Sequence, residues 1–367
     1  MESKRICNFN AGPSTLPESV LKITQESIFN YQNSGVGVLE ISHRSDTFLQ
    51  ILEETKQNLI DLLKIPKDYK IIFMQGGARF QFATIPLNFC PQNESADYIT
   101  TGYWSHCAFE EANKSNISLQ SGAIKLAAGD KNLNTLPSSY NFSPNASYLH
   151  YTSNETISGI YLDLAHFIAK VPKNVPIFCD MSSDFLSREI DVSKYDLIYA
   201  GAQKNAGVAG VSIIILKESL LNKCRKNLPI TLSYPDITAQ NSLHNTPNIF
   251  GIYMLLEMTR WLKNLGGLSE IYKLNVKKSN LIYDAIEQSN GFYKGYATKN
   301  ARGIMNIAFN LENAQLEADF IECAKKESLV GLKGHKALGG IRSSLYNALS
   351  LDCAQKLSDF MKSYVKR

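Results

Sequence analysis

Residues 196–210 read DLIYAGAQKNAGVAG, an apolar strand candidate that ends in a polar turn with a single lysine, Lys204. Small neighbours such as Ala202, Ala206 and Gly207 let a bulky planar group approach the backbone. A lysine becomes a nucleophile when its ammonium loses a proton, as it does in forming an imine with an aldehyde. From the spacing alone, a surface lysine in a turn remains the commoner explanation.

Other short apolar runs lie on both sides of this stretch and alternate with longer helical segments. The strand candidates are residues 70–74, 98–99, 148–151, 177–179, 197–200 and 211–216. This alternation predicts an α/β domain with a mostly parallel sheet flanked by helices. In such sheets ligands bind at the carboxyl ends of the strands, because the loops and helix N-termini converge there.

The pattern changes near Ile249, where long amphipathic helices begin and are joined through Gly266 and Gly267. A smaller α+β unit follows, with a strand near 304–309 and a last helix from about Asp352. We therefore predict two domains. The large one spans residues 16–258, and the small C-terminal one spans 259–367 together with 1–15.

The composition is that of an ordinary globular protein, with 44% hydrophobic and 20% charged residues and a net charge of +4. Lysines and arginines are scattered, so we expect no nucleic-acid partner. The longest apolar runs are too short for a membrane helix, and the N-terminus lacks the apolar core of a signal peptide. Seven cysteines without CxxC or metal-ligand spacing favour a reducing compartment, so we expect a cytoplasmic protein without a metal site.

Asp180 ends the apolar run 175–179 and is followed by Ser182 and Ser183. A carboxylate at a sheet end costs free energy unless it is paired. The protonated ring nitrogen of a pyridoxal cofactor is one possible partner. Capping of a following helix is the alternative.

Two further features fit a flat, phosphorylated ligand. The stretch from Gln75 to Arg79, QGGAR, offers exposed backbone N–H groups at the start of a helix. It matches neither the Walker sequence nor GxGxxG, so a nucleotide is not indicated. Trp104 follows a strand at residues 101–103 and can stack on a ring, although a core position is equally compatible with the sequence.

Cationic residues near glycine-flanked turns suit a doubly anionic substrate. They are His43, Arg44, His335, Lys336 and Arg342. Arginine binds a carboxylate in a bidentate fork, while histidine and lysine add donors to a phosphate. Any one of them in isolation is more simply a surface cation. The remaining histidines show no supporting pattern and are interpreted as structural: His106, His150, His166 and His244.

Taken together, these motifs resemble the phosphoserine aminotransferases, class V aminotransferases of pyridoxal-phosphate fold type I. The resemblance runs nearly end to end. It rests on FNAGPSTLP, ISHRS at 41–45, QGGAR, TGYW, YTSNET at 151–156, CDMSSDFLSR, YAGAQKN, HNTPN at 244–248 and KGHKALGGIRSSLYNA. The last of these stretches separates the family from its class V relatives.

The resemblance implies that pyridoxal 5'-phosphate is the cofactor and that Lys204 carries it as a Schiff base. Asp180 would pair with the ring nitrogen and Trp104 would stack on the ring. The other implied cofactor contacts are Thr156 near the ring hydroxyl, and Ala78, Arg79, Gln203, Asn245 and Thr246 at the phosphate. Asn245 and Thr246 would reach over from a second subunit, so a homodimer with shared active sites is implied.

For the substrates, the resemblance gives Arg342 to the α-carboxylate and His43, Arg44 and His335 to a phosphate. Lys336 stands where the family usually has arginine, which keeps the charge but loses the fork. The implied reaction is a ping-pong transamination from glutamate to 3-phosphohydroxypyruvate, with Lys204 moving the proton. The four-carbon phosphohydroxythreonine used in vitamin B6 synthesis is a possible second product.

Two alternatives stay open at this point. One is another class V enzyme, of the alanine–glyoxylate aminotransferase or cysteine desulfurase type. The cation cluster argues against the first, and neither Cys323 nor Cys353 lies in a Gly/Ser-rich loop suited to the second. The other alternative is a non-catalytic binding protein on the same fold, which would be expected to lack Lys204 or Asp180.

Overall fold

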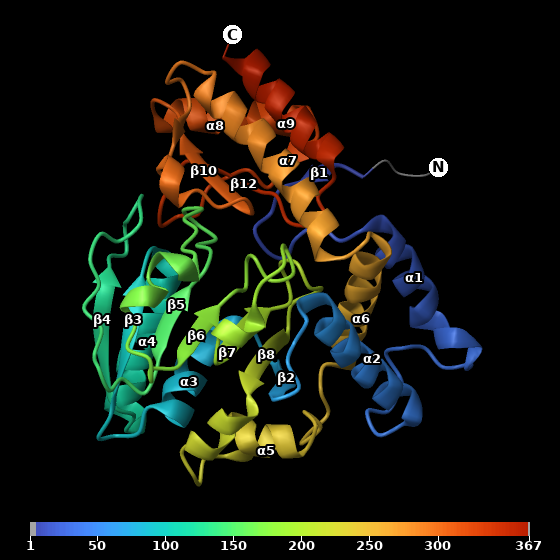
Figure 1. The fold of residues 1–367 in the computed structure, drawn as a ribbon. Coiled ribbons are helices and arrows are strands. Elements are labelled where there is room, and N and C mark those ends of the chain that lie inside the picture. Colours follow the sequence, from blue (N-terminus) through green and yellow to red (C-terminus); the bar gives the residue numbers. More distant parts are fainter. Residues whose placement is uncertain (1–4, 366–367) are drawn as a thin grey trace.

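The computed structural model describes residues 5–365 and places a seven-stranded sheet at its centre (Figure 1). The strand order is β2-β8-β7-β6-β5-β3-β4. Strand β8 runs antiparallel to both of its neighbours, and the other four pairs are parallel. The strands are β2 Tyr69–Gln75, β3 Ser95–Thr100, β4 Ala123–Gly129, β5 Leu149–Thr152, β6 Ile177–Asp180, β7 Leu197–Gly201 and β8 Val211–Lys217. The predicted α/β class with a mostly parallel sheet is confirmed.

Both faces of this sheet are buried, and the alternation of side chains along β8 shows how. Ile213 and Ile215 belong to one apolar cluster, whereas Ile214 and Leu216 belong to a second one on the opposite face. Successive side chains of a strand point to opposite faces, so a run of apolar residues is the pattern expected of a strand covered on both sides.

Helices supply the cover on each face (Figure 1). Helices α1 Glu18–Phe29, α2 Asp46–Leu63 and α6 Ile249–Asn264 contribute to the first cluster. Helices α3 Gln81–Phe89, α4 Tyr103–Leu119 and α5 Tyr234–Ala239 contribute to the second. Ser45 caps α2, since its hydroxyl accepts the Phe48 N–H at 3.3 Å. Within residues 5–365, every helix is too short or too polar to cross a membrane.

The C-terminal part forms a smaller unit above one end of the large sheet (Figure 1). It contains helices α7 Leu268–Glu287, α8 Ala314–Lys326 and α9 Leu351–Tyr364 and the antiparallel sheet β12-β10-β9, made of Ile341–Ser344, Asn306–Asn310 and Lys294–Gly295. The N-terminal strand β1 Cys7–Asn8 pairs with β11 Leu329–Val330 in the same unit.

Helix α7 connects the two units. Its early residue Ile271 belongs to an apolar cluster of the large sheet, and its later residues Ile282 and Ile286 belong to the cluster of the small unit. We keep the division into residues 16–258 and residues 1–15 with 259–367 as a proposal. Residues 1–4 and 366–367 of that small domain lie outside the described residues.

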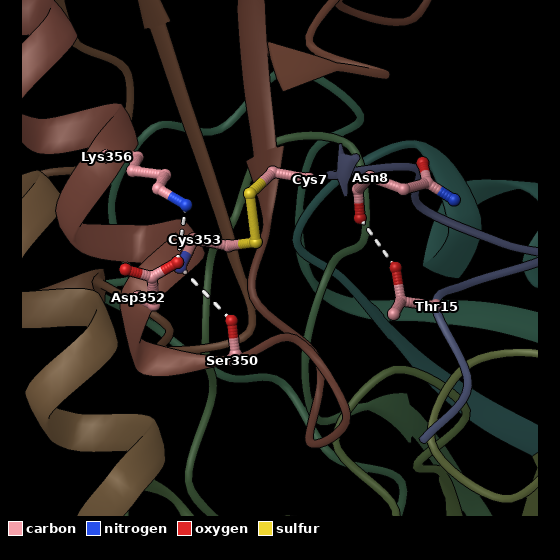
Figure 2. Close-up of a disulfide and its surroundings, with 7 residues drawn as sticks. All are labelled: Cys7, Asn8, Thr15, Ser350, Asp352, Cys353 and Lys356. Atoms are coloured by element: carbon pink, nitrogen blue, oxygen red, sulfur yellow. Dashed lines mark hydrogen bonds and ion pairs between the residues drawn. A yellow bond between two sulfur atoms is a disulfide. The ribbon is translucent and has the colours of Figure 1, made fainter. Parts of the chain in front are cut away.

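A disulfide joins Cys7 in β1 to Cys353 in the first turn of α9, across a sequence separation of 346 residues (Figure 2). Ser350 caps the same helix end by accepting the Cys353 N–H at 3.2 Å. The cysteine spacing did not predict this bond. The bond also argues against the reducing compartment that we expected from the cysteine spacing, because disulfides are rare where thiols are kept reduced.

Candidate active site

A pocket of about 120 Å³ opens at the carboxyl ends of β5, β6 and β7, where ligands bind in sheets of this type. Its lining contains seven of the nine predicted cofactor residues: Ala78, Arg79, Trp104, Thr156, Asp180, Gln203 and Lys204. A larger groove of about 880 Å³ lies at the amino ends of the strands, around Ser95, Ala123 and Pro176. We place the site in the smaller pocket, because the buried Asp180 carboxyl and the buried Lys204 amine meet there and each shifts the pKa of the other.

Lys204 lies in the turn that follows β7, and its Nζ donates to Thr156 Oγ1 at 2.7 Å. The hydroxyl of Ser14 donates to the Lys204 carbonyl, so the N-terminal segment fixes the lysine backbone. Burial lowers the pKa of Lys204, and the negative charges of Asp180 and Glu155 partly oppose this shift. The amine therefore loses its proton more readily than an exposed lysine does, as a nucleophile or base requires.

Asp180 is the last residue of β6 and is buried in the pocket wall. Its Oδ1 accepts the Ser182 N–H at 2.8 Å in a local turn. No helix begins directly after Asp180 in the described part of the chain, so the capping alternative is wrong. Burial raises the pKa of this carboxyl, while Lys204 and Ser182 lower it. One backbone contact leaves a buried carboxylate short of partners, so a cationic group in the pocket would stabilise its charged form.

Glu155 is a buried residue between the pocket residues Asn154 and Thr156, and the sequence analysis did not single it out. Its carboxylate accepts the N–H groups of Trp104 at 3.0 Å and Ser105 at 2.9 Å, at the start of α4. A carboxylate is stabilised at a helix N-terminus by the helix dipole, although burial still raises the pKa of Glu155. Glu155 thereby fixes the backbone of Trp104. The two residues are 51 positions apart, so no local pattern reveals the contact.

The predicted phosphate cradle forms where β2 ends. Gly76 has a φ of +97°, which favours glycine, and the chain then enters a single turn at Ala78–Phe80 that leads into α3. The side chain of Arg79 is mostly exposed and forms an ion pair with Glu111 at 2.9 Å. Gln203 lines the same pocket.

Three of the predicted substrate residues gather near the pocket from the small unit. Arg342 lies in β12. Burial is the main cause that lowers the pKa of His335, and the positive charges of Arg342 and Lys336 lower it further. The His335 ring lies 5.2 Å from that of Tyr103, the neighbour of Trp104. Arg342 also acts on the pKa of Lys204, so it lies close to the pocket. Among the described residues, Arg342 Nε has no hydrogen-bond partner.

The other predicted residues do not line this pocket within one chain. His43 and Arg44 lie just before α2, and Arg44 is exposed. Asn245 and Thr246 are exposed in the segment before α6, where the Gln75 side chain donates to the Thr246 carbonyl. For Asn245 and Thr246 this position agrees with a role in the site of a second subunit, which stays a prediction.

The described residues contain no group of three or more histidine, cysteine, aspartate or glutamate side chains placed to hold a metal ion. His150 lies beneath the pocket, fully buried, with its Nε2 2.9 Å from the Tyr199 hydroxyl and its ring stacked on Tyr98. Burial lowers its pKa to about 3, so it is neutral near pH 7. The interpretation of His150 as structural agrees with this environment.

Comparison with known proteins identifies the family. The class-V aminotransferase model matches residues 6–356. A phosphoserine aminotransferase of Halalkalibacterium halodurans is 44% identical, and the alignment covers 98% of each chain. The structure of the Bacillus circulans enzyme of that name superposes with a TM-score of 0.93 at 42% identity, covering 99% of each chain.

A second solved structure, a PLP-bound phosphoserine aminotransferase from Trichomonas vaginalis, is 33% identical. It superposes with a TM-score of 0.90 over 98% of this chain and 100% of that one. These likenesses span the whole chain, including the pocket and the small unit. The chain therefore belongs to the class V aminotransferases and, within them, to the phosphoserine aminotransferase family.

Proposed function

We propose that this chain transfers an amino group from glutamate to 3-phosphohydroxypyruvate with pyridoxal 5'-phosphate as cofactor, giving O-phosphoserine and 2-oxoglutarate for serine biosynthesis. The observation that carries the proposal is the placement of Lys204, Thr156 and Asp180 in one pocket, with Arg342 close above it. The family membership supplies the reaction class.

The residues of the pocket fit this cofactor. The buried Asp180 carboxylate makes one backbone contact and suits a protonated ring nitrogen, and the Gln203 Oε1 atom is buried without a partner among the described residues. The turn at Gly77 and Ala78 offers backbone N–H groups to a phosphate. Trp104 suits the face of a ring. When bound, the cofactor supplies an aldehyde for the amino group and a ring that withdraws electrons.

Lys204 is the residue that transfers the proton in the proposed reaction. Burial lowers its pKa, so the amine gives up its proton more readily than an exposed lysine and suits the transfer of a proton from the substrate Cα. The 2.7 Å contact with Thr156 holds the amine in the pocket. The negative charge of Asp180 partly opposes this lowering of the pKa.

The cations near the pocket orient the substrate. Both amino donor and acceptor carry an α-carboxylate, and the fork of Arg342 binds such a group in one plane. His335 and Lys336 lie beside it and would meet the phosphate of the acceptor. His43 and Arg44 join them only if the partner subunit presents them there. Lys336 offers a point charge instead of a fork.

The proposed assembly is a homodimer with shared active sites. Large apolar side chains are exposed on and after α1, including Phe29 at 80% and Leu39 at 56% exposure. Exposed apolar surface of this kind is typical of an interface. Light scattering measures the mass directly, and a monomer at working concentration would contradict the proposal.

The proposed location is the cytoplasm. The Cys7–Cys353 bond provides the test, because a reducing compartment would keep the pair as thiols. Alkylation of thiols in intact cells, followed by mass spectrometry of the two peptides, measures their state. A largely reduced pair supports the cytoplasm, whereas a fully oxidised pair contradicts it.

A coupled assay with glutamate tests the reaction on the wild type, on Lys204→Ala and on Lys223→Ala, which removes an exposed lysine. With 3-phosphohydroxypyruvate we expect the wild type and Lys223→Ala to turn over at similar rates. In Lys204→Ala the turnover rate should fall by about 10²–10⁴-fold or more. The four-carbon phosphorylated acceptor of vitamin B6 synthesis is run beside it. Turnover with glyoxylate but not with phosphorylated acceptors would overturn the proposed substrate.

A further inference from the structure

Lys278 lies in the middle of α7 with 1% of its surface exposed. Its Nζ approaches four backbone carbonyl oxygens of one short segment, residues 345–349. The distances are 3.0 Å to Leu345, 2.8 Å to Tyr346, 3.4 Å to Asn347 and 3.1 Å to Leu349. The segment therefore wraps around a single amino group.

The geometry of these contacts is that of an ammonium site. A protonated lysine has three N–H donors, which matches the three closest oxygens, whereas a neutral amine would turn a lone pair toward a carbonyl. Burial lowers the pKa of Lys278 to about 7, and the carbonyl dipoles favour the charged form. Within residues 5–365, no carboxylate accompanies the charge among its contacts, so the carbonyls alone compensate it.

The wrapped segment leads directly to the active site. The Asn347 N–H donates to Asn205 Oδ1 at 2.9 Å, and Asn205 follows Lys204 in the chain. Arg342 lies three residues before Leu345. A shift of the segment would thus move the neighbour of the proposed nucleophile and the proposed carboxylate ligand at once.

Three more hydrogen bonds fix the segment against both units. One turn before Lys278, the side chain of Asn275 donates to Asn347 Oδ1 at 2.9 Å. The side-chain Nδ2 of Asn347 in turn donates to the Leu186 carbonyl at 2.8 Å. The Tyr346 hydroxyl donates to the Ala11 carbonyl at 2.8 Å. Because α7 connects the apolar clusters of the two units, its ammonium acts where the units meet.

We propose that Lys278 is a positioning residue for the transamination: its ammonium holds the carbonyls of residues 345–349 and so sets Arg342 and Asn205 relative to Lys204. The catalytic part of this inference rests on the proposed function. The structural part, an ammonium site made of four carbonyls, does not.

The test is Lys278→Ala with n-propylammonium, which replaces the three carbons and the nitrogen that the substitution removes. We expect Lys278→Ala to raise the KM for glutamate and lower kcat, by about tenfold to a hundredfold in kcat/KM, because small misplacements of reacting groups are costly. Hydrogen exchange of residues 345–349 should become faster. Propylammonium should restore both properties, and propan-1-ol, of equal length without charge, should not.

Lys277→Ala is the matched control, because it removes the exposed neighbour on the same helix. It and the wild type are measured at the same amine concentration, which corrects for reaction of the amine with the cofactor. Unchanged kinetics and exchange in Lys278→Ala, or equal rescue by propan-1-ol, would overturn the proposal. If Lys278→Ala does not fold, refolding with either additive gives the same decision. A wild type without turnover contradicts only the proposed function.

Discussion

The floor of the pocket and its rim are built in different ways. The floor comes from the ends of adjacent strands of one sheet, where Asp180 ends β6, Lys204 follows β7 and Thr156 follows β5. The rim comes from β12 and the loop before it in the small unit, and the predicted partner residues lie outside the pocket altogether. Sheet topology fixes the floor, whereas the rim depends on how separate units meet.

This difference separates chemistry from substrate choice. The floor holds the groups that shift each other's pKa values, and it would serve any aminotransferase of this fold. The rim holds the cations that favour one anionic substrate over another. Substitutions in the floor should therefore lower kcat, and substitutions in the rim should mainly raise KM.

After Lys204→Ala, the largest effect is expected from Asp180→Asn, which keeps the shape of the side chain and removes its charge. Turnover should fall on the order of 10²-fold, because the positive charge on the bound ring loses its partner. Steady-state kinetics on cofactor-saturated enzyme measure this. Glu155→Gln, a substitution of another buried carboxylate close to the pocket, is the control and should slow turnover less. Equal losses would mean that the floor contains no specific partner of the ring.

A smaller, differently distributed effect is expected from Arg342→Ala. The loss of a charged, forked hydrogen bond of about 1.5–3 kcal/mol should raise the KM of both carboxylate substrates by roughly 10–100-fold. Initial rates over a range of each substrate separate KM from kcat. Arg342→Lys keeps the charge without the fork, so its KM values should lie between those of the wild type and of Arg342→Ala. A normal KM for glutamate in Arg342→Ala would show that the rim does not bind the carboxylate.

The smallest effect concerns the layer beneath the floor and appears in stability alone. His150 has a pKa of about 3 in the folded chain and 6.5 as an ordinary histidine, so the unfolded chain binds the extra proton between these values. The contribution of neutral His150 to the free energy of unfolding is complete above pH 6.5. It falls as the pH drops below that value, by up to about 1.4 kcal/mol per pH unit. Denaturant unfolding at pH 6.5 and pH 5 measures the slope.

His150→Gln should flatten that slope relative to the wild type, whatever its stability at pH 7. The control is His166→Gln, which alters an exposed histidine. If both variants keep the wild-type dependence of unfolding free energy on pH, His150 binds its proton in the folded chain as well. Burial would then not lower its pKa.

The sequence predicted the floor better than the rim for a physical reason. Strand periodicity and short polar turns are local signals, so residues 196–210 and Asp180 could be placed at strand ends before any contact was known. The contact of Glu155 with α4 joins distant parts of the chain. Lys278 follows another lysine in an amphipathic helix, where a solvated position is the ordinary expectation. The Cys7–Cys353 bond joins residues that no spacing rule relates.

That bond turns the covalent framework into a ring that runs from residue 7 to residue 353, with short tails at either end. In a ring, every residue is connected to every other by two covalent routes. A single proteolytic cut in any surface loop therefore opens the ring without dividing the molecule. The two fragments would migrate together on a denaturing gel and separate only after a thiol reductant is added.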